Sequence, residues 1–446
     1  MSTLSLTLKL PFTMLGRDFF FVWASQLLSR IGAGMTGFGL GVWLFQRTGS
    51  VLDFSGIIVF GTLPGLLITP WAGSIADRHD RRTIIIGAES LVAVSIATIG
   101  CLVWFDRFDV WHLYAIQAII SISVALQEPA AYAAISSLVP KHQFGRASGM
   151  LVVSSAMPQL IAPLMAGMLI DIIGLPGIIA LDLGTLIFSL SLLLAVSFPP
   201  LPRLVEETLS STASSTRRIV DDFSNSLIFF KEHPTMALVY GYLAIGAFLT
   251  ETVAVLVTPL VLSIYSAPTL ALIMTSAAAG ALTGGLVISV GGGPSRWTVL
   301  ILFLNVLEGL AIAIAGITTS VVGLCFCAFS VMLCNTTFFA CVESLSRRKV
   351  PLERQGRVFA LRQFITLASV PLSAIIGGML VQYVFEPALL RGGQWSGTVG
   401  DWFGTGPGRG TGLFFLVIGI LGILISLLSM THRRLQKLEQ HVPDAC

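Results

Sequence analysis

Charged residues are scarce in this chain of 446 residues. Asp, Glu, Lys and Arg together make up 11% of it, whereas 54% of the residues are hydrophobic. A soluble protein usually carries about 25% charged residues, so the composition excludes an ordinary soluble domain. The formal net charge is only +3, and no basic run is long enough to indicate a nucleic-acid partner. The chain is therefore expected to be a polytopic membrane protein in contact with a lipid bilayer.

The motifs of covalent, metal and nucleotide chemistry are also missing. The six cysteines have no disulfide or zinc-site spacing. Cys327, Cys334 and Cys341 recur at one spacing, which favours buried packing on one helix face. No GxxxxGK[ST] loop is present to bind the phosphates of ATP. We therefore expect no enzyme activity, no catalytic residues, no cofactor and no metal.

Apolar segments long enough to cross a bilayer, about 20 residues each, occupy most of the chain. The longest polar interval, 199–235, separates a predicted bundle over 1–198 from a second over 236–446, which ends in a short cytoplasmic tail. Within the interval, apolar residues from Ile219 to Phe230 recur at helical spacing and favour an amphipathic helix on the membrane surface. The expected fold is all-α, with twelve transmembrane helices in two six-helix bundles, at 18–46, 53–76, 83–104, 111–139, 146–172, 177–198, 236–265, 268–290, 297–318, 320–345, 357–385 and 411–430.

The basic residues between these segments gather on one side. Lys and Arg concentrate on the cytoplasmic side of membrane proteins, so the sequence predicts cytoplasmic N- and C-termini in a plasma membrane of the bacterial inner-membrane type. On the opposite side, the Gly-rich stretch 386–410 contains Trp395 and Trp402. Either a mobile lid or a plain connecting loop fits this stretch.

A charged loop after the second segment carries the most specific motif. Gly73-Ser-Ile-Ala-Asp77-Arg78-His79-Asp80-Arg81-Arg82 resembles the Gly-x-x-x-Asp-Arg-x-Gly-Arg-Arg/Lys loop of the major facilitator superfamily, with Asp80 in place of the second glycine. The stretches 127–130 (QEPA), 137–140 (SLVP), 145–149 (GRASG) and 355–361 (QGRVFAL) look like its drug:proton antiporter branch, which contains macrolide-efflux and enterobactin-exporter proteins. The resemblance covers nearly the whole chain and implies alternating access between two bundles.

Residues 162–167, Ala-Pro-Leu-Met-Ala-Gly, are similar to the antiporter motif of this superfamily, Gly-Pro-x-x-Gly-Gly. The small residues allow two helices to approach closely, and Pro163 removes one backbone donor and can kink the helix. General helix packing fits the stretch as well as an antiport-specific role.

Three charged residues, Arg30, Glu128 and Glu251, fall near the middle of the first, fourth and seventh segments. A charge at the bilayer centre costs at least about 2.5–3.5 kcal/mol. The resemblance implies that these helices line the central cavity. We predict that Glu128 and Glu251 carry protons and that Arg30 lowers the proton affinity of an acid in one conformation; a static ion pair is the alternative. Three further acids, expected to be structural because the third, sixth and ninth helices are peripheral in this family, are Glu89, Asp182 and Glu308.

The resemblance also suggests gates. A conformational latch is predicted at Gly73, Asp77, Arg78, Arg81 and Arg82, because the nearby start of the eleventh helix would favour the Asp77 carboxylate; a solvated loop is the alternative.

A second gate is predicted at the cytoplasmic side. Glu343 and Arg362 are inner-gate candidates, unless they lie there simply as interfacial charges. Flexible methionines, aromatics and amides suit varied amphiphiles, and the candidates for the substrate cavity are Trp23, Gln26, Phe38, Gln127, Tyr132, Met157, Gln159, Phe248 and Asn335.

These features together predict a secondary active exporter of small amphiphilic compounds, such as a drug, a macrolide or a natural product. It is expected to act as a monomer and to exchange its substrate for protons. A dedicated exporter of a siderophore or peptide antibiotic remains open, as does a transporter-derived sensor or scaffold. The scaffold is disfavoured because it has no need of costly buried charges.

Overall fold

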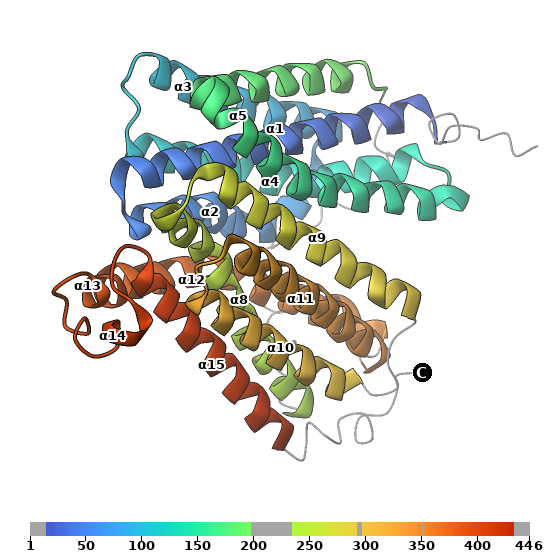
Figure 1. The fold of residues 1–446 in the computed structure, drawn as a ribbon. Coiled ribbons are helices and arrows are strands. Elements are labelled where there is room, and N and C mark those ends of the chain that lie inside the picture. Colours follow the sequence, from blue (N-terminus) through green and yellow to red (C-terminus); the bar gives the residue numbers. More distant parts are fainter. Residues whose placement is uncertain (1–14, 198–233, 292–296, 350–351, 432–446) are drawn as a thin grey trace, which may run out of the picture.

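The computed structural model describes residues 15–197, 234–291, 297–349 and 352–431, in which all the regular structure is helical. The predicted linker therefore lies outside the described residues, except for Pro234 and Thr235 at the start of α8. Figure 1 labels the helices, which are α1 (Arg17–Thr48), α2 (Val51–Arg78), α3 (Arg81–Trp104), α4 (Val110–Leu138), η2 (Lys141–Gln143), α5 (Phe144–Leu194), α8 (Pro234–Ile264), α9 (Ala267–Gly291), α10 (Trp297–Ile317), α11 (Val321–Lys349), α12 (Leu352–Leu380), η3 (Val381–Phe385), α13 (Glu386–Leu389), α14 (Gly400–Phe403) and α15 (Arg409–Thr431).

Short turns with local capping reverse the chain between consecutive helices. Gly49 ends α1 in the left-handed conformation, with φ of 61°, which glycine adopts without a Cβ penalty. The Ser50 hydroxyl then accepts a hydrogen bond from the backbone N–H of Asp53 at 3.1 Å and caps α2. The two helices therefore run antiparallel across a two-residue connection.

The fifth and sixth predicted segments form one interrupted helix, α5, of 51 residues. A straight helix of this length would measure about 75 Å, more than twice the thickness of the bilayer core, about 30 Å. Gly174 interrupts it with φ of 65° and ψ of −176°, so the chain turns back at a single glycine.

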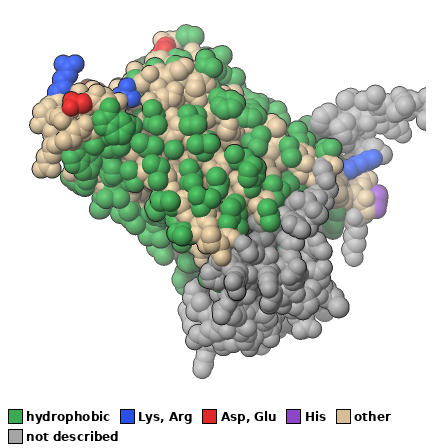
Figure 2. Space-filling view, turned by 60° about the horizontal axis from the view of Figure 1, so that its bottom comes forward, with side chains coloured by type: hydrophobic (Ala, Val, Ile, Leu, Met, Phe, Trp, Pro, Cys, Tyr) green, Lys and Arg blue, Asp and Glu red, His purple; other side chains and the backbone are tan. Residues whose placement is uncertain are grey.

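Ten of the described helices are long and apolar enough to cross a membrane. That number counts the interrupted α5 once and omits α1, a helix of 32 residues. Every predicted segment thus corresponds to a helical stretch, and the all-α polytopic fold is confirmed. Hydrophobic side chains cover much of the face in Figure 2, where the coloured charged side chains lie toward the two ends. This distribution matches a bilayer belt with water at both ends.

Two groups of helices are recognisable in Figure 1: α1 to α5, the N-terminal group, and α8 to α15, the C-terminal group. Contacts of α5 with α9 and of α2 with α12 join them. We call the end with Gly49, Gly174, α13 and α14 the capped end, and the end with Arg17, Asp80 and Lys349 the open end.

In the described ranges, buried side chains of both groups share clusters in the half of the molecule toward the capped end. Phe45 and Phe54 of the N-terminal group share one buried cluster with Leu256 and Phe414 of the C-terminal group. Near the open end each group has its own cluster, one around Phe19 and one that includes Phe338. In Figure 1 the groups accordingly diverge from the left, where α13 and α14 lie, toward the right. The described parts of the two groups are thus in contact at the capped end and apart at the other.

The Gly-rich stretch that follows η3 folds into a compact cap. Leu389, Phe403 and Leu413 form a small buried cluster within it. The carboxylate of Glu386 accepts hydrogen bonds from the backbone N–H groups of Gly408, at 2.5 Å, and Thr411, at 3.0 Å. These bonds tie the beginning of the stretch to its end, at the start of α15.

A cavity of about 410 Å³ lies beside this cap. Phe45, Gly49 and Val51 of the N-terminal group line one side, and Gln382 and Pro387 line the other. Its walls therefore come from both groups.

Candidate functional site

An ion pair joins two helices of the N-terminal group. Arg30 of α1 and Glu128 of α4 approach to 3.7 Å between Nη2 and Oε1. Their side chains are 39% and 52% exposed, so both remain accessible. Accessible ion pairs contribute little to stability, typically about 0–1 kcal/mol. The pair can therefore be exchanged for other partners at small cost.

Glu251 of α8 lies next to the walls of a second cavity. The flanking residues Thr250 and Ala254 line this space of about 350 Å³, together with Gln159 of α5 and Met274 of α9. The Glu251 side chain is partly buried, and no hydrogen bond or ion pair joins it to another described residue. The cavity has a mainly apolar wall with few polar groups, as small-molecule sites commonly have.

Two other glutamates are buried and hydrogen-bonded to neutral donors. Glu89 of α3, 2% exposed, accepts from Gln127 Nε2 at 2.7 Å and from Ser189 Oγ at 2.8 Å. Glu308 of α10, 4% exposed, accepts from Thr250 Oγ1 at 2.6 Å and lies 3.5 Å from Asn335 Nδ2. Each of the two acids thus lies within hydrogen-bond distance of one side-chain amide and one hydroxyl group.

These contacts place two of the predicted cavity residues. The amides of Gln127 and Asn335 point to the buried acids rather than to open space. Consecutive residues of a helix point about 100° apart, so Gln127 can face α3 while Glu128 faces Arg30. The sequence alone did not indicate the two acid–amide pairs.

The remaining cavity candidates occupy varied positions. Trp23 donates to the carbonyl of Met150 at 2.7 Å. Gln159 lines the 350 Å³ cavity, and Tyr132 and Met157 are exposed. Phe38 is buried among side chains of both groups. The other two are Gln26, whose Nε2 is buried with no hydrogen-bond partner among the described residues, and Phe248, which is half-buried.

The third buried acid, Asp182 of α5, lies against α1. A Cβ at Gly32 would collide with Asp182 Oδ1 and with the hydroxyl of Thr185. A glycine is therefore needed for α1 and α5 to pack at this distance.

The charged loop ties α3 to its neighbours. Asp80 accepts from the backbone N–H of Arg82 at 3.2 Å and caps α3. Arg81 Nη1 donates to the Ala133 carbonyl of α4 at 3.0 Å, and Arg82 Nη2 donates to the Leu194 carbonyl of α5 at 3.1 Å. The side chains of Asp77 and Arg78, at the end of α2, lie outside the described part of the structure, whereas Gly73 is exposed.

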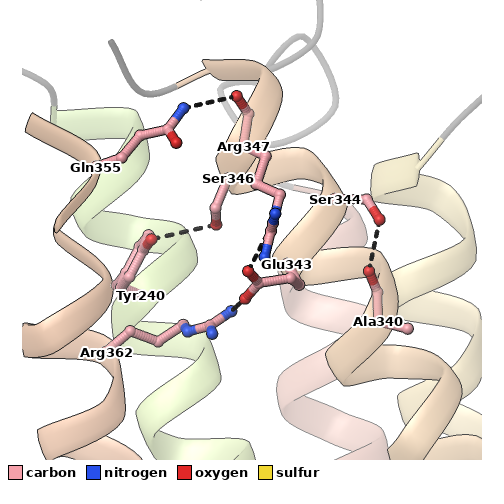
Figure 3. Close-up of polar contacts among 8 residues, drawn as sticks. All are labelled: Tyr240, Ala340, Glu343, Ser344, Ser346, Arg347, Gln355 and Arg362. Carbon is pink, nitrogen blue, oxygen red and sulfur yellow. Dashed lines mark hydrogen bonds and ion pairs between the residues drawn. The ribbon is translucent and has the colours of Figure 1, made fainter. Parts of the chain in front are cut away.

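The predicted pair of Glu343 and Arg362 is present near the open end (Figure 3). Glu343 of α11 contacts Arg362 of α12 and also accepts from Arg347 Nε at 2.9 Å. Beside them, Tyr240 of α8 donates to Ser346 at 3.1 Å. All of these helices belong to the C-terminal group, so in this conformation the cluster joins helices within one group.

Small residues allow helices to pack closely, both within the N-terminal group and between the two groups. The stretch 162–167 lies on α5, where Ala162 packs so near α1 that a Cβ at Gly34 would be 2.7 Å from it. A Cβ at Gly167 would collide with Ala271 of α9.

A second close approach joins α2 and α12. A Cβ at Gly378 would collide with Ser55, and Gln382 Oε1 accepts from the backbone N–H of Val51 at 2.9 Å. The groups therefore meet with backbones in close approach.

Comparisons with known proteins agree with this architecture. The family model described as Major Facilitator Superfamily matches residues 22–374. Macrolide efflux protein A of Streptococcus pyogenes is 25% identical over 378 residues, covering 82% of this chain and 90% of that protein. The protein of the same name from Enterococcus faecalis is 26% identical, over 70% of this chain and 96% of its own length.

Solved structures share the fold at low sequence identity. A bacterial homolog of the human lysosomal transporter Spinster is 15% identical, with a TM-score of 0.68 over 94% of this chain and 98% of that one. The nucleoside transporter NupG is 13% identical, with a TM-score of 0.62 over 93% of this chain and 99% of that one.

Proposed function

Because the chain belongs to the Major Facilitator Superfamily, and is thus a membrane transporter rather than an enzyme, we propose that it exports small amphiphilic compounds in exchange for protons. The two relatives named macrolide efflux protein A favour a drug, a macrolide or a natural product as the substrate. The proposed cycle loads the substrate from the open end and releases it when the capped end opens.

The accessible Arg30–Glu128 pair is the observation that carries this proposal. An opposite charge nearby favours the ionised form of a carboxylate, and separating the two charges removes this preference. In the proposed role Glu128 takes up the proton, with Glu251 as a second carrier, and Arg30 disfavours protonation while it is close. The substrate would occupy the mainly apolar cavity that includes Gln159.

We further propose that the open end faces the cytoplasm of a bacterial cell. The Lys and Arg residues between helices concentrate in the segments that lie at the open end, which is the usual cytoplasmic bias. On this proposal the cap lies outside the plasma membrane, and residues 1–198 and 236–446 act as two bundles of one monomer that rock against each other.

Reconstituted proteoliposomes containing a pH-sensitive dye test the proposal. An outward gradient of each member of a panel of macrolides, dyes and siderophores is imposed on the purified protein. We expect at least one macrolide to move protons in the opposite direction, and Glu128→Gln to abolish this movement. Asp401→Asn, which removes an exposed acid of the cap, is the matched control and should behave as the parent protein.

Unchanged coupling in folded Glu128→Gln protein would contradict the proposed carrier. Silence across the whole panel from demonstrably folded parent protein would contradict export of varied amphiphiles.

A further inference from the structure

A third cavity, of about 30 Å³, lies between α8, α10 and α15 of the C-terminal group, next to the 350 Å³ cavity. Thr250 and Ile312 line both spaces. The remaining polar groups of the small cavity belong to Tyr242, Asn305, Glu308 and Ser426. Its volume and polar lining suit a bound water molecule.

We propose that Glu308 is an additional proton-binding site, which exchanges its proton with the 350 Å³ cavity through the hydroxyl group of Thr250. The part of this inference that concerns coupled transport rests on the proposed export function; the existence of the proton-binding site does not.

The Thr250 hydroxyl has two acceptors within hydrogen-bond distance. It lies 2.6 Å from Glu308 Oε1 and 3.0 Å from the carbonyl oxygen of Gly246. When Glu308 is ionised, the hydroxyl donates to its carboxylate. When Glu308 is protonated, the acid can donate to Thr250 Oγ1 while the hydroxyl hydrogen turns to Gly246. Both protonation states therefore keep their hydrogen bonds, which removes the usual cost of an unsatisfied buried group.

Proton transfer through Thr250 is balanced. The hydroxyl gives its proton to Glu308 Oε1 and takes one from a hydronium ion in the larger cavity, so that the hydroxyl is restored, the hydronium ion becomes water and the carboxylate becomes a carboxylic acid. No electron transfer or further reactant is required. The reverse sequence releases the proton.

The surroundings of Glu308 do not provide a permanent counter-charge. Tyr242 of α8 and Cys334 of α11 are the titratable groups that interact with it electrostatically. Glu308 is the only charged residue of α10, Glu251 is the only one of α8, and Arg409, at the capped end, is the only one of α15. The charged residues of α11, from Glu343 to Lys349, lie at its open end. No described Lys or Arg forms an ion pair with Glu308, so proton binding is the available way to neutralise it.

A hydrogen-bonded group of side chains lines the small cavity on the open-end side of Glu308. Asn305 Nδ2 donates to the Tyr242 hydroxyl at 2.7 Å, and that hydroxyl lies 2.9 Å from Ser426 Oγ. Ser426 donates in turn to the Gly422 carbonyl at 2.8 Å. Tyr242 is about two helical turns from Thr250. Glu308 thus lies between the larger cavity and this polar group in the wall of the small cavity.

Carbodiimide labelling tests proton binding without any transported substrate. Dicyclohexylcarbodiimide adds to protonated carboxyl groups in apolar surroundings and leaves an N-acylurea that peptide mass spectrometry can locate. In the full-length protein in proteoliposomes, we expect the Glu308 peptide to be labelled at low pH and the labelling to fall as pH rises. Recovery of this peptide without label at every pH would overturn the proposal.

Transport variants test whether the bound proton moves. We expect Glu308→Gln to lose the proton movement that a macrolide gradient drives, whereas Glu89→Gln, the matched buried acid that lines neither cavity, keeps it. Thr250→Val should also lose it, and Thr250→Ser, which keeps the hydroxyl, should retain it. If Glu308→Gln does not fold, the comparison of Thr250→Val with Thr250→Ser and the carbodiimide labelling still test the proposal.

Normal coupling in Glu308→Gln, or equal coupling in the two Thr250 variants, would contradict a transported proton at this site. If the parent protein moves no protons with any compound of the panel, the proposed export function fails, while the labelling still decides whether Glu308 binds a proton.

Discussion

Asp80 shows how one residue can replace a glycine without strain. The family loop has glycine at this position, but φ of Asp80 is −59°, which any residue adopts. Its carboxylate uses the position to cap α3 through the N–H of Arg82. The departure from the motif therefore exchanges backbone freedom for a helix cap.

This exchange predicts a graded loss of stability. Asp80→Ala should lower the free energy of unfolding by about 0.5–2 kcal/mol, because a carboxylate N-cap is lost. Asp80→Gly should lower it by only about a few tenths of a kcal/mol, because glycine is tolerated at the N-cap. Thermal or denaturant unfolding of the purified variants in detergent measures the difference. Stabilities of both variants equal to that of the parent protein would show that the cap contributes nothing.

The sequence could place charged residues along the helices but not the direction in which they point. It put Arg30 and Glu128 inside the first and fourth segments, and the structure joins the two in an ion pair. The sequence did not indicate that Gln127 would turn to Glu89, because the face that a residue presents depends on which neighbouring helix packs there. The contact between Glu308 and Thr250 could not be predicted either, because it also depends on how two helices far apart along the chain pack together.

Among the elements, helix bounds were the most predictable feature. The segments expected at 83–104 and 297–318 correspond to α3 (Arg81–Trp104) and α10 (Trp297–Ile317). Charged, proline and glycine residues mark helix ends in membrane proteins. The π-helical η3 and the folded cap had no such local signal, because Glu386 is held by bonds to residues more than 20 positions later.

The contact of α5 with α9 gives a prediction at the level of the element. Gly167→Val should destabilise the protein by about 1–3 kcal/mol, because the added side chain overpacks the contact with Ala271. Gly149→Val, on the same helix but with open space around its Cα, is the matched control. Thermal unfolding of both variants in detergent measures the effect, and equal melting temperatures would contradict close packing at this contact.

At the scale of the whole molecule, the two ends differ in how the groups meet. We expect cysteines placed at Val51 and Gln382 to be joined by a short bifunctional reagent, because the Gln382 side chain reaches the backbone of Val51. Cysteines at Ser137 and Ser344, on the open-end parts of α4 and α11, should stay unjoined. A background without the native cysteines and a gel-mobility assay provide the measurement.

Linking the first pair should also stop transport, because both groups would be held together at the capped end. Efficient cross-linking of the second pair alone would show that the protein rests in the opposite conformation.

The cavity beside the cap has a pharmacological consequence. Phe45 and Val51 wall it from one group and Gln382 and Pro387 from the other, so it is lost when the capped ends separate. On the proposed orientation it opens to the outside of the cell. A macrocycle or an antibody loop seated there would wedge the protein in one conformation, and it would block efflux without ever having to cross the membrane or compete with the exported compound.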